Sequence, residues 1–470
     1  MNKLDIGIIG LSTMGKALAL NMCDHQILVA GYNRSREVTE KIIQENHVGF
    51  HGFLSLEIFV KALSKPRKIM LMIQAGKAVD SIIEQLIPLL DKGDIIMDGG
   101  NSFYEDTIKR QIDLKKLGLY YYGVGISGGE DGARFGPSMM PSGDKTVYKS
   151  IKWIFEAIAA RSEGKPCVTY IGENGSGHFV KMVHNGIEYA DMQLISEAYL
   201  LLKQLGNFNQ DELSAIFNHW NQGNTKSYLM KITAEIMNEK DDLTSDYLLN
   251  RIKSKSQQKG TGRWTSIEAM KLGMDVSLIN SAGNARLLSN EDLLRSKLIS
   301  TMKTYKEQNS NQEVLINTIH DALYLARLIA YAQGFSLLTS ASKIHHWQLD
   351  LSKIADIFKA GCIIQSALLQ PIKEAYEKDA TLENLILDPF FLDEITTKQS
   401  ALRKCVVDGA NNGIPIPTMM NALAYLDALR NDQNGANLIQ AQRDYFGAHT
   451  YERKDLEGVF HHEWGSQNGK

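Results

Sequence analysis

The chain has 470 residues, more than one hydrophobic core usually holds, so we expect two or three domains. Hydrophobic residues make up 44% and charged residues 22%, as in ordinary globular proteins, and a net charge of −3 gives no support for nucleic-acid binding. The four cysteines lack the spacing of a disulfide framework or metal site, no apolar run approaches the roughly 18 residues of a membrane span, and we see no signal peptide. We therefore expect a cytoplasmic protein with no metal site and no membrane partner.

The first predicted strand, residues 4–9, leads into a dinucleotide-binding fingerprint and then a helix to about residue 23. The fingerprint consists of Gly10, Leu11, Ser12, Thr13, Met14 and Gly15. In this strand–turn–helix context, backbone amides at the helix N-terminus bind a pyrophosphate. Because Ser12 replaces the second glycine of the pattern, a tight turn without a ligand remains an alternative.

A second strand, residues 26–32, ends at Asn33, Arg34 and Ser35. NAD-binding folds place a carboxylate here for the ribose hydroxyls, and a carboxylate would repel a ribose phosphate. A guanidinium and a hydroxyl would instead bind that phosphate. The sequence therefore favours NADP, with a solvated loop arginine as the alternative.

Three further strands, residues 67–73, 94–97 and 119–124, end in small polar loops. The first strand ends at Ile73, and its loop holds Gln74 and Ala75. The second loop holds Asn101, and the third holds Ser127, Gly128 and Gly129. Loops at the carboxyl ends of parallel strands bind ligands, although ordinary turn chemistry could explain each loop alone. We predict an α/β Rossmann-type domain over residues 1–176.

A long helix is predicted next, after the turn signal at residues 172–177. Lys181, His184, Asn185 and Glu188 stand at i, i+3, i+4 and i+7 and share one face, while an apolar stripe covers the opposite face. The plain alternative is a solvated polar face. Such faces are usually rich in Lys and Glu, whereas this one has a single Lys and a single Glu with His and Asn between them. Lys181 and Glu188 can converge on a small molecule lying across the helix.

Helical patterns dominate from residue 177 to about 433, for example over residues 185–204, 225–237 and 314–332, which predicts a large all-helical domain. Its loop at residues 258–264 holds Lys259 and Thr261, and Arg286 adds another cation. This loop suits an anionic substrate, although an exposed basic loop is the simpler alternative. The remaining segment, residues 434–470, is a tail dense in aromatic side chains that needs a covering surface.

Together these segments resemble decarboxylating 6-phosphogluconate dehydrogenases over essentially the whole chain. The motifs that carry the resemblance are VKMVHNGIEY (residues 180–189), QKGTGRW (258–264), IMDGGNS (96–102), GISGGE (125–130) and ANLIQAQRDYFGAHTYER (436–453). The chain differs from the family pattern at Ser12, Ser254, Gln257, Gln365 and the triplet Pro141-Ser142-Gly143.

The resemblance implies a role for each matching residue. Lys181 corresponds to the general base and Glu188 to the general acid. The sugar-acid contacts would be Asn101, Ser127, Gly128, Gly129, His184 and Asn185, and the phosphate and chain contacts Tyr189, Lys259, Thr261 and Arg286. Arg443 and His449 would reach the partner subunit's site in a homodimer, although a tail folded on its own subunit is an alternative. The NADP contacts would be Gly10, Leu11, Ser12, Thr13, Met14, Gly15, Asn33, Arg34, Ser35, Ile73, Gln74, Ala75 and Asn101.

The implied reaction is the oxidative decarboxylation of 6-phosphogluconate to ribulose 5-phosphate and carbon dioxide, with NADP reduced to NADPH. This reaction belongs to the oxidative pentose phosphate pathway and to gluconate utilization. Two alternatives remain: another NADP-dependent 3-hydroxyacid dehydrogenase, or a catalytically silent NADPH-binding regulatory paralogue.

Overall fold

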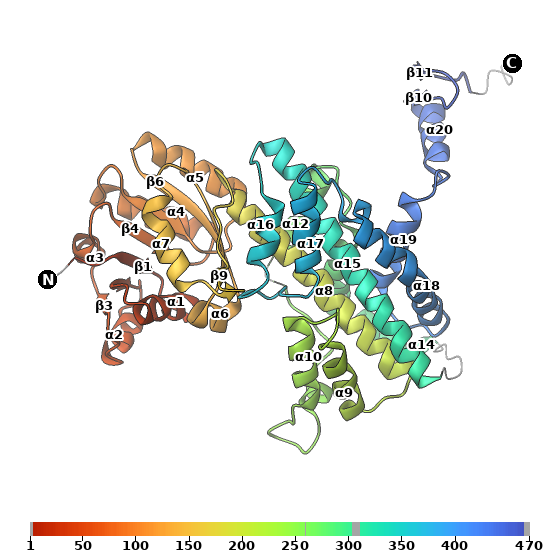
Figure 1. Cartoon of the computed structure of the whole chain (residues 1–470), viewed down its shortest axis with the longest axis horizontal. Helices are drawn as coiled ribbons and strands as arrows, with labels where there is room; N and C mark the ends of the chain where they lie inside the picture. Colours follow the sequence, from red (N-terminus) through yellow and green to blue (C-terminus); the bar gives the residue numbers. More distant parts are fainter. Residues whose placement is uncertain (1–2, 259, 303–310, 465–470) are drawn as a thin grey trace.

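The computed structural model describes residues 3–258, 260–302 and 311–464. A sheet region at the N-terminal end continues into a larger helical region, and a short tail projects from the far side of the helices (Figure 1). This arrangement confirms the predicted fold class. Lys259 lies outside the described residues. Among the described residues, no helix is both long enough and apolar enough to cross a membrane.

The N-terminal region is built on a seven-stranded sheet of order β3-β2-β1-β4-β5-β6-β7. Its strands are β1 (Ile6–Ile9), β2 (Val29–Tyr32), β3 (Phe50–Phe53), β4 (Lys68–Leu71), β5 (Ile95–Asp98), β6 (Tyr120–Ser127) and β7 (Ser138–Ser142). The first six are parallel and β7 is antiparallel to β6. All five predicted strands are present, with ends that differ by up to three residues.

Two strands of this sheet, β3 and β7, were not predicted. The sequence of β3, FHGF, is short, and only its first residue is buried. The sequence of β7, SMMPS, contains Pro141, which lacks the N–H that a central strand needs. Because β7 lies at the edge of the sheet, it tolerates this proline.

Apolar side chains pack on both faces of the sheet, which explains why its strands read as continuous apolar runs. In β1, Ile6 and Ile8 belong to one buried cluster and Ile9 belongs to another. The helices of this region are α1 (Thr13–Asp24), α2 (Arg36–Gln44), α3 (Leu56–Ala62), α4 (Lys77–Leu86), α5 (Tyr104–Lys116), α6 (Gly129–Phe135) and α7 (Lys149–Ile158).

Two long helices, α8 (Ser176–Leu205) and α15 (Gln312–His345), form the centre of the helical region (Figure 1). α8 begins within the predicted turn at residues 172–177 and ends at Leu205, next to the predicted end at 204, whereas α15 extends beyond its predicted range of 314–332. Gly334 lies inside α15, where it provides room for α8: an added Cβ would lie 2.5 Å from the Ile187 side chain. The core between these helices also holds a fully buried ion pair, in which Arg327 Nε lies 2.6 Å from Asp191 Oδ1.

Other helices surround α8 and α15. They are α9 (Gln210–Trp220), α10 (Tyr228–Asn238), α11 (Leu248–Arg251), α12 (Thr261–Lys271), α13 (Ser277–Ser289), α14 (Asp292–Thr301), α16 (Leu351–Ile357), α17 (Leu369–Lys378), α18 (Pro389–Asn411) and α19 (Pro417–Leu429). The tail follows α19 and consists of α20 (Ala436–Gly447) and a small hairpin of β10 (Tyr451–Glu452) and β11 (Val459–Phe460). This layout supports a proposed division into residues 1–176, 177–433 and 434–470.

Candidate active site

The polar face of α8 is buried at the junction between the sheet and the helices. Lys181 is 7% exposed, Asn185 8% and His184 0%, and the Glu188 side chain is 21% exposed. The alternative of a solvated face is therefore wrong. The close approach depends on small residues in the sheet, since a Cβ added at Gly125 in β6 would lie 2.6 Å from Lys181 Cβ.

A hydrogen-bonded chain joins β6, α8 and α12 across the site. Ser127 Oγ lies 3.1 Å from His184 Nε2, and His184 Nδ1 lies 3.1 Å from Asn185 Oδ1. Asn185 Nδ2 donates to Thr261 Oγ1 at 3.0 Å. Since that bond turns the amide oxygen of Asn185 toward the imidazole, we assign the ring proton to Nδ1, which leaves Nε2 to accept from Ser127. Lys181 Nζ lies 3.3 Å from the same Nδ1.

Burial shifts the ionisable groups of this face toward their neutral forms. It lowers the pKa of Lys181, an effect that nearby Glu188 partly opposes. It raises the pKa of Glu188, against the attraction of Lys181 and Arg286. Burial also holds the pKa of His184 well below its ordinary value. Both shifts favour the forms that catalysis needs, a neutral amine as base and a protonated carboxyl as acid, on one helix face.

Basic and aromatic side chains lie next to Glu188, at one end of this polar face. The Arg286 guanidinium from α13 stacks on the Tyr189 ring, 3.5 Å from its centroid. Glycine is required at position 262 because an added Cβ would lie 2.5 Å from the same ring. Thr261 is the first residue of α12, where unpaired backbone amides favour an anion. Three of the four predicted phosphate and chain contacts are thus adjacent, and the fourth, Lys259, is not described.

The fingerprint turn has the shape that a dinucleotide requires. Gly10 has a φ of +96°, and a Cβ at Gly15 would overlap the Gly10 carbonyl oxygen, so both glycines are needed. Leu11 N donates to Asn33 Oδ1 at 3.0 Å, which ties the turn to the end of β2. Ser12 and Thr13 are exposed where α1 begins, and Met14 is half-buried. The residues present therefore fit a bound pyrophosphate.

The remaining predicted cofactor contacts follow the same edge of the sheet. Arg34 is exposed beyond β2, and Ser35 is the residue before α2. Ile73, Gln74 and Ala75 follow β4, and Asn101 follows β5. Because β2, β1, β4 and β5 are adjacent and parallel, these loops share one edge.

Sequence reasoning missed the role of Asp98, the last residue of β5. Its fully buried carboxylate accepts from Gly100 N at 3.0 Å, Ser102 Oγ at 2.6 Å and the Tyr121 hydroxyl at 2.9 Å. These bonds fix the loop that presents Asn101. An acidic residue at a strand end, directly before two glycines, was the available signal.

The departures from the family pattern lie outside the acid–base cluster. Ser12, Ser254, Gln257 and Gln365 are all exposed. The backbone carbonyl of Gln365 accepts from Tyr228 N at 3.0 Å, so its side chain plays no part in that contact. Ser142 is buried, and its hydroxyl donates to the Gly123 carbonyl at 3.1 Å.

The structure does not bring the tail residues to the site of their own chain. Arg443 and His449 are exposed, and the tail projects away from the sheet end of α8 (Figure 1). Within the part of the chain that the structure describes, the Arg443 side chain donates one hydrogen bond, to Gln440 Oε1 in the same tail at 3.2 Å.

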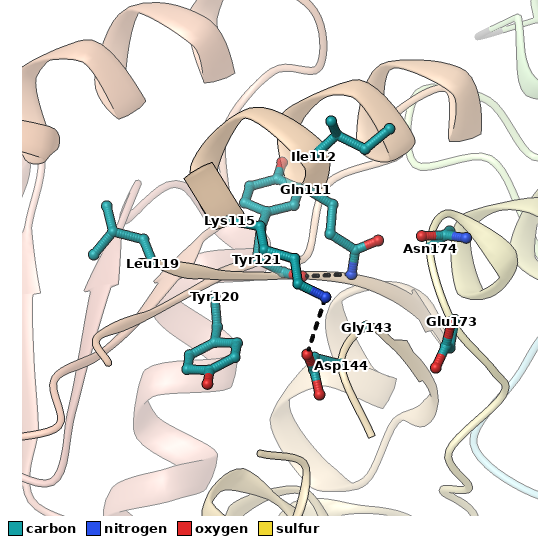
Figure 2. Close-up of a pocket in the computed structure, with 10 residues that line it drawn as sticks. All are labelled: Gln111, Ile112, Lys115, Leu119, Tyr120, Tyr121, Gly143, Asp144, Glu173 and Asn174. Atoms are coloured by element: carbon teal, nitrogen blue, oxygen red, sulfur yellow. Dashed lines mark hydrogen bonds and ion pairs between the residues drawn. The ribbon is translucent and has the colours of Figure 1, made fainter. Parts of the chain in front are cut away.

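A separate cleft of about 180 Å³ lies between α5, the start of β6 and the loops at residues 143–144 and 173–174 (Figure 2). Lys115 lies 3.6 Å from Asp144 across it, and Gln111 Nε2 donates to the Tyr121 carbonyl at 3.0 Å. Its lining contains none of the predicted site residues. We therefore place the candidate site along α8.

Within the described residues, no group of three or more His, Cys, Asp or Glu side chains could hold a metal.

Known protein families match both regions of the chain. The NAD binding domain of 6-phosphogluconate dehydrogenase matches residues 5–172, and the C-terminal domain of 6-phosphogluconate dehydrogenase matches residues 177–464. In Bacillus subtilis (strain 168), the NADP(+)-dependent decarboxylating enzyme is 47% identical over 99% of this chain and 100% of its own length. The NAD(+)-dependent enzyme of the same strain is 48% identical over 98% of this chain and 99% of its own length.

A solved structure of Plasmodium falciparum 6-phosphogluconate dehydrogenase has the same fold, with a TM-score of 0.95 and 42% identity. The match covers 98% of this chain and 100% of that one. That protein was determined in its apo form, with NADP+ and with 6-phosphogluconate. Identity at this level over the full length, together with both domain matches, shows that the chain belongs to the 6-phosphogluconate dehydrogenase family.

Proposed function

We propose that this protein oxidises and decarboxylates 6-phosphogluconate to ribulose 5-phosphate and carbon dioxide, with reduction of NADP. The observation that carries the proposal is the buried face of α8, where burial lowers the pKa of Lys181 and raises that of Glu188. The family membership and the substrate bound by the Plasmodium falciparum relative support the choice of substrate.

Lys181 acts as the general base. Its neutral amine takes the proton of the substrate's third-carbon hydroxyl while a hydride leaves that carbon, and bound NADP supplies the hydride acceptor. The resulting ammonium donates a hydrogen bond to the new ketone, and this withdraws electrons as the bond to the carboxylate breaks and carbon dioxide leaves. Lys181 gives its proton to the ketone oxygen as the enediol forms. Glu188 then donates its proton to the first carbon of the enediol while the oxygen returns its proton to Lys181, which completes ribulose 5-phosphate.

The surrounding residues orient the substrate between these two groups. Ser127, His184 and Asn185 offer hydrogen bonds beside Lys181 and suit the hydroxyl and carboxylate end of the sugar acid. Tyr189 and Arg286 lie beside Glu188, where they suit the phosphate end. We assign Asn101, Gly128 and Gly129 to the sugar-acid end, and Thr261 and Lys259 to the phosphate end.

We also propose that NADP is preferred over NAD. Arg34 and Ser35 occupy the place beyond β2 where a ribose phosphate would lie, and a guanidinium pairs well with phosphate. Family membership does not decide this preference, because relatives of nearly equal identity include one NADP(+)-dependent and one NAD(+)-dependent enzyme, so the proposal rests on Arg34 and Ser35.

A homodimer with shared active sites completes the proposal. The tail exposes large apolar side chains, with Leu438 63%, Tyr445 64% and Phe446 72% exposed, and this surface needs a partner. A second copy would cover it and receive Arg443 and His449 at its own site. We place the protein in the cytoplasm, since all four cysteines are unpaired thiols.

The test is an absorbance assay for NADPH with 6-phosphogluconate, together with a carbon dioxide measurement. The proposal predicts equal amounts of NADPH and carbon dioxide. A related 3-hydroxyacid dehydrogenase would reduce NADP with a simpler 3-hydroxyacid and release no carbon dioxide. A silent regulatory paralogue would bind NADPH but give no turnover, and either result would contradict the proposal.

A further inference from the structure

One carboxylate in the tail is fully buried, although most of its neighbours are exposed. Asp444, in the last turn of α20, has no exposed surface. It accepts hydrogen bonds from Thr450 N at 2.9 Å, His461 Nδ1 at 2.8 Å, His462 N at 3.0 Å and Trp464 Nε1 at 2.7 Å. The segment that follows the helix therefore folds back around this side chain.

Only a carboxylate satisfies all four donors. Oδ1 accepts from Thr450 and His461, and Oδ2 accepts from His462 and Trp464. Burial alone would raise the pKa of Asp444, but these hydrogen bonds outweigh it and the pKa is lowered, so the group is ionised at neutral pH. An asparagine of the same shape would place an NH₂ group against at least one N–H donor, whichever way it turned.

The bonded residues stand next to the two side chains that we assign to the partner subunit's site. Asp444 directly follows Arg443, and Thr450 directly follows His449. The backbone around His449 is unusual, because Ala448 has a φ of +50° and Thr450 a φ of +59°. Residues other than glycine adopt this left-handed conformation only where contacts hold them in it. The bond from Thr450 N to Asp444 is one such contact.

We propose that Asp444 is a positioning residue, which ties the segment at residues 459–464 to α20 and so holds Arg443 and His449 ready for the partner subunit's substrate. The inference rests on the shared-site part of the proposed function. A tail organised in advance loses less conformational freedom when the site assembles, so the apparent affinity for substrate is higher. It also gives a role to His461 and Trp464, which no step of the reaction uses.

The test compares Asp444→Asn with Asp455→Asn in the full-length enzyme. Asp455 is the matched control, because it lies in the same tail but pairs with Arg453 at the exposed surface. We expect Asp444→Asn to raise the KM for 6-phosphogluconate about tenfold or more, with the KM for NADP changed less than about twofold. Hydrogen exchange at the amides of Thr450 and His462 should accelerate in Asp444→Asn and not in the control.

An unchanged substrate KM in a dimeric Asp444→Asn enzyme would overturn the inference, even if exchange accelerates. If sedimentation shows that this variant is no longer dimeric, Trp464→Phe decides, because it removes one donor and keeps an aromatic ring at that position. We expect Trp464→Phe to raise the substrate KM about threefold, and an unchanged KM would again contradict the inference.

Arg443→Ala separates this inference from the proposed function. If Arg443→Ala and Asp444→Asn both leave the substrate KM unchanged, the tail does not reach a substrate and the shared site itself fails. If Arg443→Ala raises the KM while Asp444→Asn does not, the shared site stands and only the positioning role of Asp444 fails.

Discussion

Two regions carry the side chains that we assign to the substrate, and they present them in opposite ways. On α8, Lys181, His184 and Asn185 are buried and hydrogen-bonded within their own chain. In the tail, Arg443 and His449 are exposed, and the supporting Asp444 is the only buried residue between 434 and 464. The side chains on α8 find their hydrogen-bond partners within one chain, whereas Arg443 and His449 of the tail remain exposed and can contact another surface.

The difference shows how the cost of burying polar groups is distributed. On α8, burial prepares two groups for proton transfer, because it shifts the pKa values of Lys181 and Glu188 toward a neutral base and a protonated acid. In the tail, four hydrogen-bond donors hold the buried Asp444 ionised, so it fixes the conformation of the tail and takes no part in proton transfer. Changes on α8 should therefore affect turnover, and changes in the tail should affect substrate affinity.

The largest effect is expected from Lys181→Met. Methionine keeps the length and packing of the lysine but cannot take a proton, so turnover should fall below detection, by about 10⁴-fold or more. NADP binding, measured by calorimetry, should be nearly unchanged. Lys203→Met is the matched control, since Lys203 lies exposed near the end of the same helix. If Lys181→Met kept more than a few per cent of activity, the base would lie elsewhere.

Glu188→Gln should reduce kcat by about 10²–10⁴-fold, because the amide cannot donate a proton to the enediol. The pH profile tests the same role. Burial raises the pKa of Glu188, so the acid form persists to higher pH and activity should fall as pH rises through this pKa. That decline should be absent in the variant. Glu235→Gln, at an exposed position in α10, serves as the control, and an unchanged profile in Glu188→Gln would contradict the assignment.

Arg443→Ala tests the other side of the comparison. The loss of a charge-assisted hydrogen bond to phosphate is worth about 1.5–3 kcal/mol, which raises the substrate KM by about 10–150-fold. kcat at saturating substrate should change much less. Arg453→Ala, elsewhere in the exposed tail, should leave the KM near the wild-type value. A fall in kcat without a rise in KM would break the distinction between the two regions.

Arg34→Asp extends the comparison to a third exposed position. A carboxylate would repel the ribose phosphate, so the ratio of kcat/KM for NADP to that for NAD should fall by about 10–100-fold. Lys41→Asp makes the same charge reversal later in the adjoining helix α2 and should leave the ratio unchanged. An unaltered ratio in Arg34→Asp would show that another group reads the phosphate.

Local patterns in the sequence predicted much of this architecture, because they encode periodic burial. Five strands read as apolar runs, and the helical spacing of Lys181 and Glu188 placed them on one face. The short β3 and the proline-containing β7 lack such a pattern. Contacts between distant segments also left no local trace: Ser127 is 57 residues from His184, and Asn185 is 76 residues from Thr261. The four hydrogen bonds to Asp444 likewise form only because residues 450–464 fold back against α20.

The most direct test of the contrast between α8 and the tail is subunit complementation. Lys181→Met and Arg443→Ala proteins are mixed under conditions that allow subunits to exchange, and NADPH formation is assayed at a substrate concentration where each alone is nearly inactive. If the tail serves the partner, each heterodimer has one site with both changes and one with neither, so about a quarter of wild-type activity should return. If each tail serves its own subunit, every site keeps one change, and exchanged dimers without recovered activity would contradict the shared site.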